Sequence, residues 1–330
     1  MSGGDYSLVG DIGGTNARFA LVHAGSLMLE TVKVLPCRDY PTIDAAIGDY
    51  LRRAGVAGVQ DACLAVAATP GSGTRVKMTN NPWCFDSGEL RRRFGWDRFK
   101  VINDFTAMAL GIPQLAADQR VHVCGGPGDS RRPRLVMGPG TGLGVSALVP
   151  SLAGWVPLVT EGGHVDFAPT DNTEMAILTI LRDRFGRVSA ERILSGQGLL
   201  NLYQAHAGVQ DLPVRLDTPE QITAAALDGI DELARRVLSH FCEILGRVAG
   251  NAALTFGSTG GVYLCGGMLP NFIDFFLQSS FQKAFADKGR MREMLEATPV
   301  YVVTEALTGL SGAAEALTNP EVSGDHAPYR

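Results

Sequence analysis

The sequence predicts an α/β fold divided into two domains, and three observations support this prediction. Up to Asp104, stretches of strand composition and of helical periodicity alternate in the order βββαβαβ, which is typical of an α/β layer with a mixed sheet. The chain has 330 residues, enough for two domains of ordinary size. Its hydrophobic content of 45% and charged content of 19% are those of a globular protein.

The elements of the first half follow from local patterns. Apolar residues recur at helical spacing after Pro41 and predict one buried helix face, made by Ile43, Ala46, Ile47, Tyr50, Leu51 and Ala54. Strand composition predicts strands just before Asp11 and at Phe19–Val22, Leu29–Leu35, Ala62–Ala67, Val76–Thr79 and Lys100–Ile102. Ser87–Phe94 is predicted to be helical.

The second half repeats this alternation. It opens on a predicted hairpin at Leu135–Val149, and a later strand ends in the Gly266-Gly267 turn. The last strand is predicted at Val300–Val303. Helices are predicted at Glu174–Phe185, at Asp217–Leu254, after Gly267 with Phe272, Phe276 and Leu277, and at Gly309–Leu317.

The first glycine-rich turn joins two strand-like runs and ends in Thr15. Its glycines permit positive φ, so Gly13-Gly14 predicts a tight turn. No Lys follows and the chain returns to strand composition, which excludes the P-loop that opens a helix. Backbone N–H groups and the Thr15 hydroxyl could hold phosphate oxygens, with Asp11 near a bound Mg²⁺. A glycine-turned hairpin without a ligand is the alternative for this stretch alone.

A second turn echoes the first. Gly138-Pro139-Gly140-Thr141-Gly142 also lies between two apolar strand-like runs, and its Gly140-Thr141 aligns with Gly14-Thr15. Two such hairpins could hold the two ends of one polyphosphate. Chance similarity between glycine-rich turns is the alternative.

Composition excludes several classes of protein. The chain has 29 Lys and Arg against 34 Asp and Glu, a net charge of −5. It therefore lacks the excess of basic residues that is typical of nucleic-acid-binding proteins. The region after Met1 lacks a signal-peptide pattern, and the uncharged runs Leu135–Thr160 and Val248–Ile273 contain Gly and Pro at turn-like spacings, so no membrane span is expected. The six cysteines show no metal-binding spacing and are expected to be reduced thiols, mostly buried, in a cytosolic protein.

Two further stretches carry polar residues suited to a ligand. Asn103 and Asp104 fall between a predicted strand and helix, where α/β sheets present binding groups, although an Asp at this place could instead cap the helix. Glu161 and His164 flank two glycines and could both face one small polar ligand. A metal site is the alternative, but the glycines argue against the helix it would need. Gly266-Gly267 would let a flat ring lie against the backbone.

These residues together carry a resemblance to a known family. The motifs are Gly10-Asp11-Ile12-Gly13-Gly14-Thr15-Asn16, Ile102-Asn103-Asp104-Phe105, Gly138-Pro139-Gly140-Thr141-Gly142-Leu143-Gly144, Glu161-Gly162-Gly163-His164-Val165-Asp166-Phe167 and Gly266-Gly267. Their combination resembles bacterial glucokinases, in particular the ATP-dependent proteobacterial group of the actin/hexokinase/Hsp70 superfamily. The similarity runs from about residue 6 to the final helix.

The resemblance implies a two-domain actin-like ATPase (ribonuclease H-like) fold with mixed sheets and an interdomain cleft. Residues 1–114 would form a small domain, 115–305 a large domain, and a helix at about 306–330 would pack back on the small one. Composition, as described above, leads us to expect a cytoplasmic protein that binds neither nucleic acid nor membrane. A homodimer is common among similar proteins.

The resemblance also implies an activity, the transfer of the γ-phosphoryl group of ATP to the 6-hydroxyl of D-glucose. It implies that ATP phosphates bind Gly10, Asp11, Ile12, Gly13, Gly14 and Thr15, and also Gly140, Thr141 and Gly142. It implies adenosine near Gly266 and Gly267, and Mg²⁺ on Asp11 directly or through water. Glucose would bind Asn103, Asp104, Glu161, His164 and Glu191, with Asp104 as the general base.

One loop departs from the family pattern. Ala68-Thr69-Pro70-Gly71-Ser72-Gly73 carries an extra residue on the expected sugar side, which leaves discrimination among hexoses open. A kinase for another hexose or an amino sugar therefore stays an alternative. A non-catalytic sugar sensor is another, although the presence of Asp11, Thr15, Asp104 and Gly140 argues against it. The cysteine-rich zinc motif of the related ROK family is absent from the sequence.

Overall fold

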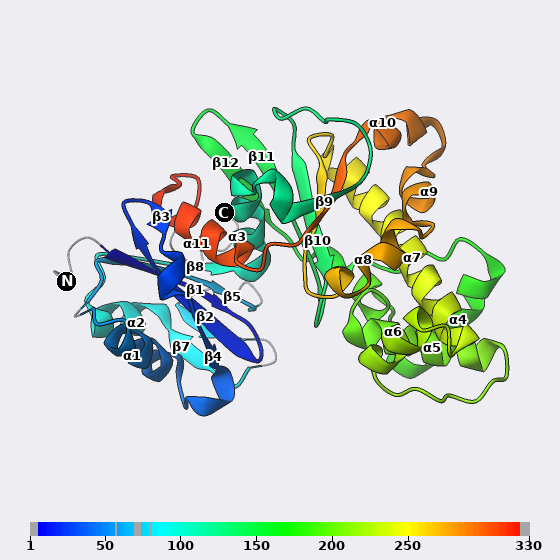
Figure 1. Cartoon of the computed structure of the whole chain (residues 1–330), viewed down its shortest axis with the longest axis horizontal. Helices are drawn as coiled ribbons and strands as arrows, with labels where there is room; N and C mark the ends of the chain where they lie inside the picture. The colour runs from blue at the N-terminus through cyan, green and yellow to red at the C-terminus, as the bar shows by residue number, and fades with distance from the viewer. Residues whose placement is uncertain (1–5, 57, 69–73, 79–80, 324–330) are drawn as a thin grey trace. The chain divides into compact units, whose positions relative to one another are not determined.

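The computed structural model describes residues 6–56, 58–68, 74–78 and 81–323, and the chain divides into two compact units (Figure 1). Unit 1 comprises Met1–Ala116, Leu148–Val159 and Glu305–Arg330, and unit 2 comprises Ala117–Ala147 and Thr160–Thr304. The large-domain range expected from the sequence, 115–305, thus includes a segment that groups with unit 1. Two hydrogen bonds tie this segment to the C-terminal part of unit 1: Asn319 Nδ2 donates to Trp155 O at 2.9 Å, and Ser151 Oγ donates to Glu321 Oε1 at 3.0 Å.

Unit 1 is built on a mixed sheet with the strand order β3-β2-β1-β5-β8 and with β4 also beside β2. The strands of this sheet are β1 (Tyr6–Ile12), β2 (Asn16–His23), β3 (Ser26–Leu27), β4 (Lys33–Pro36), β5 (Asp61–Val66) and β8 (Arg98–Asn103). Unit 1 also contains strands outside this sheet: the small pair β6 (Arg75–Lys77) and β7 (Cys84–Asp86), and β12 (Gly154–Val159). Its α-helices are α1 (Ile43–Arg53), α2 (Ser87–Phe94), α3 (Asp104–Gly111) and α11 (Thr308–Thr318).

The two faces of this sheet pack on different helices. Alternate residues such as Leu8 and Leu64 lie in one core with Ile43 and Tyr50 of α1, which confirms the predicted helix face. The opposite face carries α3 and α11. These two helices approach so closely that a Cβ on Gly312 would lie 1.7 Å from a backbone carbonyl oxygen of α3.

The strand predicted at Leu29–Leu35 is only partly correct. Leu29–Thr31 forms a 3-10 turn, and the strand begins at Lys33. The Thr31 hydroxyl donates to Met28 O at 2.6 Å and accepts from Leu21 N at 2.9 Å. These local bonds satisfy the backbone in a turn instead of an extended strand. The loop residues 69–73, singled out from the sequence, lie outside the described residues.

Unit 2 has a second mixed sheet, in which the strands follow the order β11-β10-β13-β14-β9. The strands are β9 (Arg120–Cys124), β10 (Arg134–Pro139), β11 (Leu143–Ser151), which ends in the segment grouped with unit 1, β13 (Val262–Leu264) and β14 (Val300–Val303). The α-helices are α4 (Asn172–Phe185), α5 (Gly196–Val209), α6 (Pro219–Leu227), α7 (Glu232–Phe256), α8 (Ile273–Leu277), α9 (Phe281–Ala286) and α10 (Arg292–Ala297).

The helical stretch predicted at Asp217–Leu254 is two helices, α6 and α7. Gly229 adopts a φ of 68° between them, and the Asp231 side chain caps α7 by accepting from Ala234 N at 2.8 Å. The long α7 buries one face, including Val237 and Phe241, in the core of the unit.

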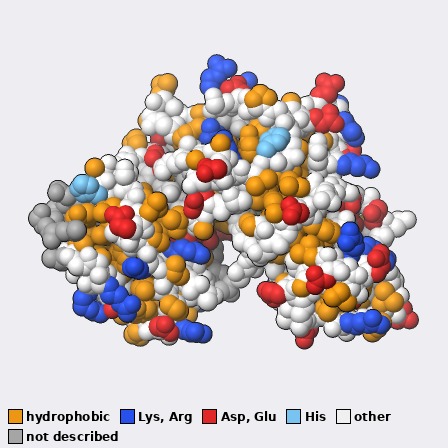
Figure 2. All heavy atoms as spheres, viewed as in Figure 1, with side chains coloured by type: hydrophobic (Ala, Val, Ile, Leu, Met, Phe, Trp, Pro, Cys, Tyr) orange, Lys and Arg blue, Asp and Glu red, His pale blue; other side chains and the backbone are white. Residues whose placement is uncertain are grey.

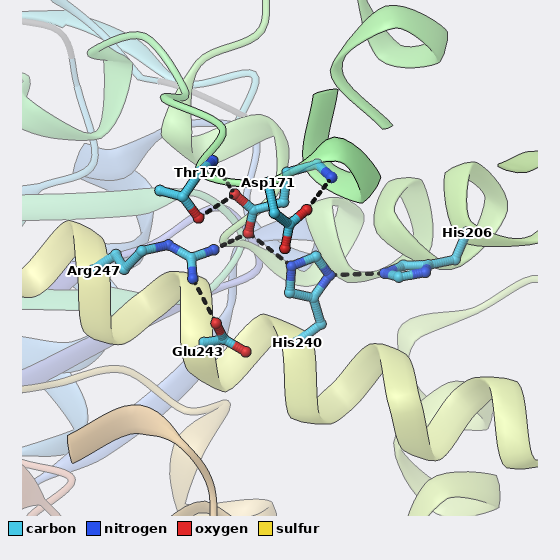
Figure 3. A network of polar contacts seen from close by, with 7 residues as sticks. Thr170, Asp171, His206, His240, Glu243 and Arg247 are labelled. Atoms are coloured by element: carbon cyan, nitrogen blue, oxygen red, sulfur yellow. Dashed lines mark hydrogen bonds and ion pairs between the residues drawn. The ribbon is translucent and has the colours of Figure 1, made fainter. Parts of the chain in front are cut away.

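A buried polar network joins α4, α5 and α7 (Figure 3). The carboxylate of Glu174 is fully buried and accepts hydrogen bonds from Thr170 N at 2.7 Å, from His240 Nε2 at 2.8 Å and from the guanidinium of Arg247. His206 Nε2 lies 2.8 Å from His240 Nδ1. Burial lowers the pKa of both imidazoles, that of His206 to about 4, and so favours their neutral forms. The proton of His240 is therefore on Nε2, and its Nδ1 accepts from His206.

The surface is of mixed charge. On the face drawn in Figure 2, basic and acidic side chains are interspersed. Within the described residues, no helix combines the length and apolar character needed to cross a membrane. The six cysteines are free thiols, of which only Cys84 is exposed.

Candidate functional site

The carbonyl oxygens of the turn between β1 and β2 accept hydrogen bonds that fix the turn. Gly13 N donates to Asn16 O at 2.9 Å and closes the turn. Cys37 N donates to Thr15 O at 2.8 Å, and the buried Asn81 donates through Nδ2 to Gly13 O at 3.1 Å. Within the described part of the chain, no backbone bond occupies the N–H groups of Gly14 or Thr15. These groups are therefore available to an anion.

Asp11 lies beside this turn at the end of β1. Its Oδ2 accepts from Arg18 Nη1 at 3.2 Å, and a Cβ on Gly309 in the first turn of α11 would lie 3.2 Å from the same oxygen. Burial raises the pKa of the Asp11 carboxyl, and Arg18 acts in the opposite direction. A carboxylate oxygen in this place suits Mg²⁺, a cation that binds oxygen ligands. The neighbouring Gly10 and Ile12 are buried in β1, so their side-chain positions belong to the core.

The turn between β10 and β11 is anchored to the start of α5. Gly140 N donates to Gly142 O at 2.8 Å, and Gly196 N, at the first residue of α5, donates to Gly140 O at 2.8 Å. Thr141 is exposed at the tip of the turn. This second hairpin forms as predicted, with its glycine turn fixed by a helix N-terminus.

The turn at Gly266 lies next to the Gly140 turn. Strands β10 and β13 are parallel neighbours, and Cys265 N donates to Met137 O at 2.8 Å where they end. A Cβ on Gly138 would lie 1.9 Å from Cys265 O, and Gly266 has a φ of 93°. The two loops thus meet at the carboxyl ends of neighbouring parallel strands, the usual place for a ligand in an α/β sheet.

A pocket of about 480 Å³ opens beside these two turns. Its lining comprises Gly140, Thr141, Gly196, Pro219, Glu220, Thr223, Ala224, Leu227, Met268, Asn271 and Phe272. This volume is in the range of small-molecule sites. The contribution of α6 is not evident from the sequence, because its residues have no motif that separates them from an ordinary amphipathic helix.

Three glycines at these turns leave space that the protein does not fill. A Cβ on Gly140 or Gly267 would meet nothing within 4 Å, and one on Gly13 would make only an ordinary contact at 3.5 Å. None of the three has a positive φ, so these glycines do not use the backbone freedom that glycine permits. Neither backbone conformation nor packing requires glycine there.

In unit 1, Asn103 and Asp104 stand at the junction of β8 and α3. The cap of α3 is Asn103, whose Oδ1 accepts from Phe105 N at 2.9 Å and from Thr106 N at 3.2 Å. Asp104 is the first helical residue, so the hypothesis that Asp104 is the N-cap is wrong. Capping uses only the oxygen of the Asn103 amide, and its Nδ2 can still donate to a ligand.

In unit 2, three of the predicted sugar-binding side chains lie together. Gly162–His164 forms a single 3-10 turn after Glu161. His164 Nε2 lies 3.8 Å from Glu161 Oε2, and His164 Nδ1 lies 3.8 Å from Glu191 Oε1. All three side chains are partly exposed, and no group of His, Cys, Asp and Glu suited to a metal ion occurs among the described residues. The cluster offers acceptors and an imidazole to a polar ligand.

These features define a class of protein: an ATP-dependent sugar kinase with the two-domain actin-like ATPase fold. The family model described as Glucokinase matches residues 8–320. The chain is 69% identical to the glucokinase of Marinobacter nauticus, over 98% of this chain and all of that protein, and 56% identical to that of Hahella chejuensis over the same shares. The solved glucokinase of an Antarctic psychrotroph superimposes with a TM-score of 0.87 at 36% identity, covering 96% of this chain and 99% of that one.

The chain belongs to the glucokinase family. The expectations of fold and of an ATP-dependent hexose kinase that phosphorylates glucose are confirmed at the level of the family.

Proposed function

We propose that the chain transfers the γ-phosphoryl group of ATP to the 6-hydroxyl of D-glucose, with Asp104 as the general base. The observation that carries the assignment of Asp104 is the capping of α3 by its neighbour Asn103. Helix capping thus does not explain a carboxylate at the end of a parallel strand, where α/β sheets bind ligands.

An alcohol is a weak nucleophile, so the base must both orient and deprotonate it. A carboxylate of Asp104 that accepts a hydrogen bond from the 6-hydroxyl directs an oxygen lone pair at the γ-phosphorus. As the new P–O bond forms, the bond from the γ-phosphorus to the β,γ-bridging oxygen breaks, ADP leaves, and the hydroxyl proton passes to the carboxylate. General-base assistance of this kind is worth about 10²- to 10⁴-fold.

The remaining sugar hydroxyls would be read by Asn103, Glu161, His164 and Glu191. Carboxylate oxygens accept from hydroxyl groups, and the amide Nδ2 and an imidazole N–H donate to them. A sugar that lacks one of these hydroxyls leaves a polar partner unpaired, which costs affinity.

The phosphates of ATP would bind the turns at Gly13–Thr15 and Gly140–Thr141, with adenosine in the pocket between Gly267 and α6. Phosphoryl transfer depends mainly on positioning and on neutralising charge. Asp11 would hold Mg²⁺, directly or through water, and bound Mg²⁺ supplies charge neutralisation of the phosphates. We also propose a cytoplasmic location, the absence of nucleic-acid and membrane partners, and a homodimer as the assembly.

The test is a coupled ADP-release assay with Mg-ATP and a panel of glucose, mannose, fructose, galactose and N-acetylglucosamine. We expect glucose to be the best substrate by kcat/KM and the product to be the 6-phosphate. A panel in which another sugar is clearly preferred would refute the glucose assignment. No turnover of any of these sugars would refute the kinase proposal.

A further inference from the structure

Two glycines of the same turn face different surroundings. A Cβ on Gly140 would meet nothing within 4 Å. A Cβ on Gly142 would lie 2.5 Å from Oε2 and 3.3 Å from Cδ of Glu191, too close for both groups to keep their positions. A side chain at position 142 would therefore displace the Glu191 carboxylate, whereas a Cβ at position 140 would displace nothing.

Each oxygen of the Glu191 carboxylate has a different neighbour. Its Oε2 accepts from Leu143 N at 2.9 Å, at the point where the second turn enters β11. Its Oε1 lies 3.8 Å from His164 Nδ1, in the cluster proposed to bind sugar. The backbone is fixed as well, since Ser195 Oγ donates to Glu191 O at 2.8 Å. One carboxylate thus links the cluster to the turn.

Charge argues against a direct phosphate contact at Gly142. A phosphate seated there would face the Glu191 carboxylate, and like charges at such short range repel. The N–H of Leu143, the next residue, already donates to that carboxylate. The phosphate-binding part of the turn is then Gly140 and Thr141, on the side of the nucleotide-sized pocket.

We infer that Gly142 and Glu191 form a positioning pair: Gly142 leaves the space in which Glu191 bonds Leu143 N–H, and this bond sets both the sugar-facing oxygen and the conformation of the phosphate-binding turn. The inference rests on the proposed function, because it takes Glu191 as a sugar contact. A hexose that fixes Glu191 also fixes the turn, so sugar and nucleotide bind with positive coupling, and the coupling is reciprocal.

The test compares Gly142→Ala with the matched control Gly140→Ala by isothermal titration calorimetry. In Gly142→Ala the new methyl group meets the end of a flexible side chain, so the carboxylate moves and the fold remains. We expect the Kd of glucose, measured without nucleotide, to rise at least tenfold in Gly142→Ala and to stay within twofold of wild type in Gly140→Ala. Gly140→Ala should instead weaken binding of a non-hydrolysable ATP analogue.

A second pair of variants tests the link itself. Glu191→Gln retains an oxygen that can accept from Leu143 N–H, whereas Glu191→Ala does not. We expect nucleotide affinity without glucose to fall at least threefold in Glu191→Ala and to stay near wild type in Glu191→Gln. A merely sugar-binding Glu191 would leave both nucleotide affinities unchanged, which would overturn the inference.

Two other outcomes would also overturn it: glucose affinity that is unchanged in Gly142→Ala, or glucose affinity that falls equally in both glycine variants. Failure of the proposed function is separate, because wild-type protein would then bind no glucose in the same calorimeter. If Gly142→Ala does not fold, the two Glu191 variants decide alone.

Discussion

Replacing Asp104 by Asn separates catalysis from helix stability. The cap of α3 comes from Asn103, so Asp104→Asn removes no capping bond. The wild-type Oδ1 accepts from Phe105 N at 2.9 Å, and an amide oxygen can accept there too. We therefore expect the free energy of unfolding to change by less than about 0.5 kcal/mol. Turnover should fall by at least about 10²-fold, equivalent to about 2.7 kcal/mol of transition-state stabilisation, because an amide cannot take the proton.

Two variants of the preceding residue, Asn103, serve as matched controls for Asp104→Asn. Asn103→Ala loses both capping bonds and should cost about 1 kcal/mol of stability. Asn103→Ser keeps a capping oxygen but loses the Nδ2 donor, so stability should hold while the KM for glucose rises.

The assay measures ADP release at saturating glucose and ATP, with thermal melting and nucleotide affinity determined on the same protein. The expected pattern for Asp104→Asn is low kcat, near-normal melting and near-normal nucleotide binding. Near-wild-type turnover in Asp104→Asn would refute Asp104 as the base. A large loss of both stability and turnover would show that the carboxylate has a structural role that the capping geometry does not reveal.

Three further predictions concern the metal and the buried network. Chelation of divalent cations should abolish turnover and leave the melting midpoint nearly unchanged, and metal analysis of active protein should find no stoichiometric zinc. Glu174→Gln should cost about 3 kcal/mol in urea unfolding, because Arg247 keeps a buried charge with less compensation, whereas Glu243→Gln on the exposed end should cost under about 1 kcal/mol. The pKa of His206 is about 4 when folded and about 6.5 when unfolded, so the unfolded chain binds the extra proton and stability should fall from pH 6.5 towards 4, by up to about 3 kcal/mol. His206→Gln should flatten that part of the stability curve, and an identical curve would contradict the assignment.

Features encoded by nearby residues could be predicted from the sequence. The apolar spacing from Ile43 to Leu51 places the buried face of α1, and the strand and turn composition places both glycine hairpins. Those patterns depend on residues within a few turns or one hairpin, and no distant partner is needed to produce them.

Features that depend on residues far apart in the sequence could not be predicted. Asn81 holds the first glycine turn across 68 residues of sequence, and α6 lines the nucleotide-sized pocket without any motif of its own. The sequence also does not reveal which of two neighbouring side chains caps a helix. Asn103 and Asp104 are both good helix caps, and only the backbone geometry decides between them. The break between α6 and α7 is also hard to predict, because the sequence on both sides of it is typical of a helix.

The close approach of α11 to α3 bears on how the protein is made. Gly111 and Gly312 allow this contact, since a Cβ on either would meet backbone atoms of the other helix or its first turn. A ribosome delivers α3 before unit 2 and α11 after it, so the part of the unit 1 sheet that α11 covers stays uncovered while unit 2 is synthesised. Unit 2 can therefore complete its fold before unit 1, although unit 1 begins to emerge first. Newly made chains stalled before residue 308 would expose the part of the N-terminal sheet that α11 covers to chaperones and proteases.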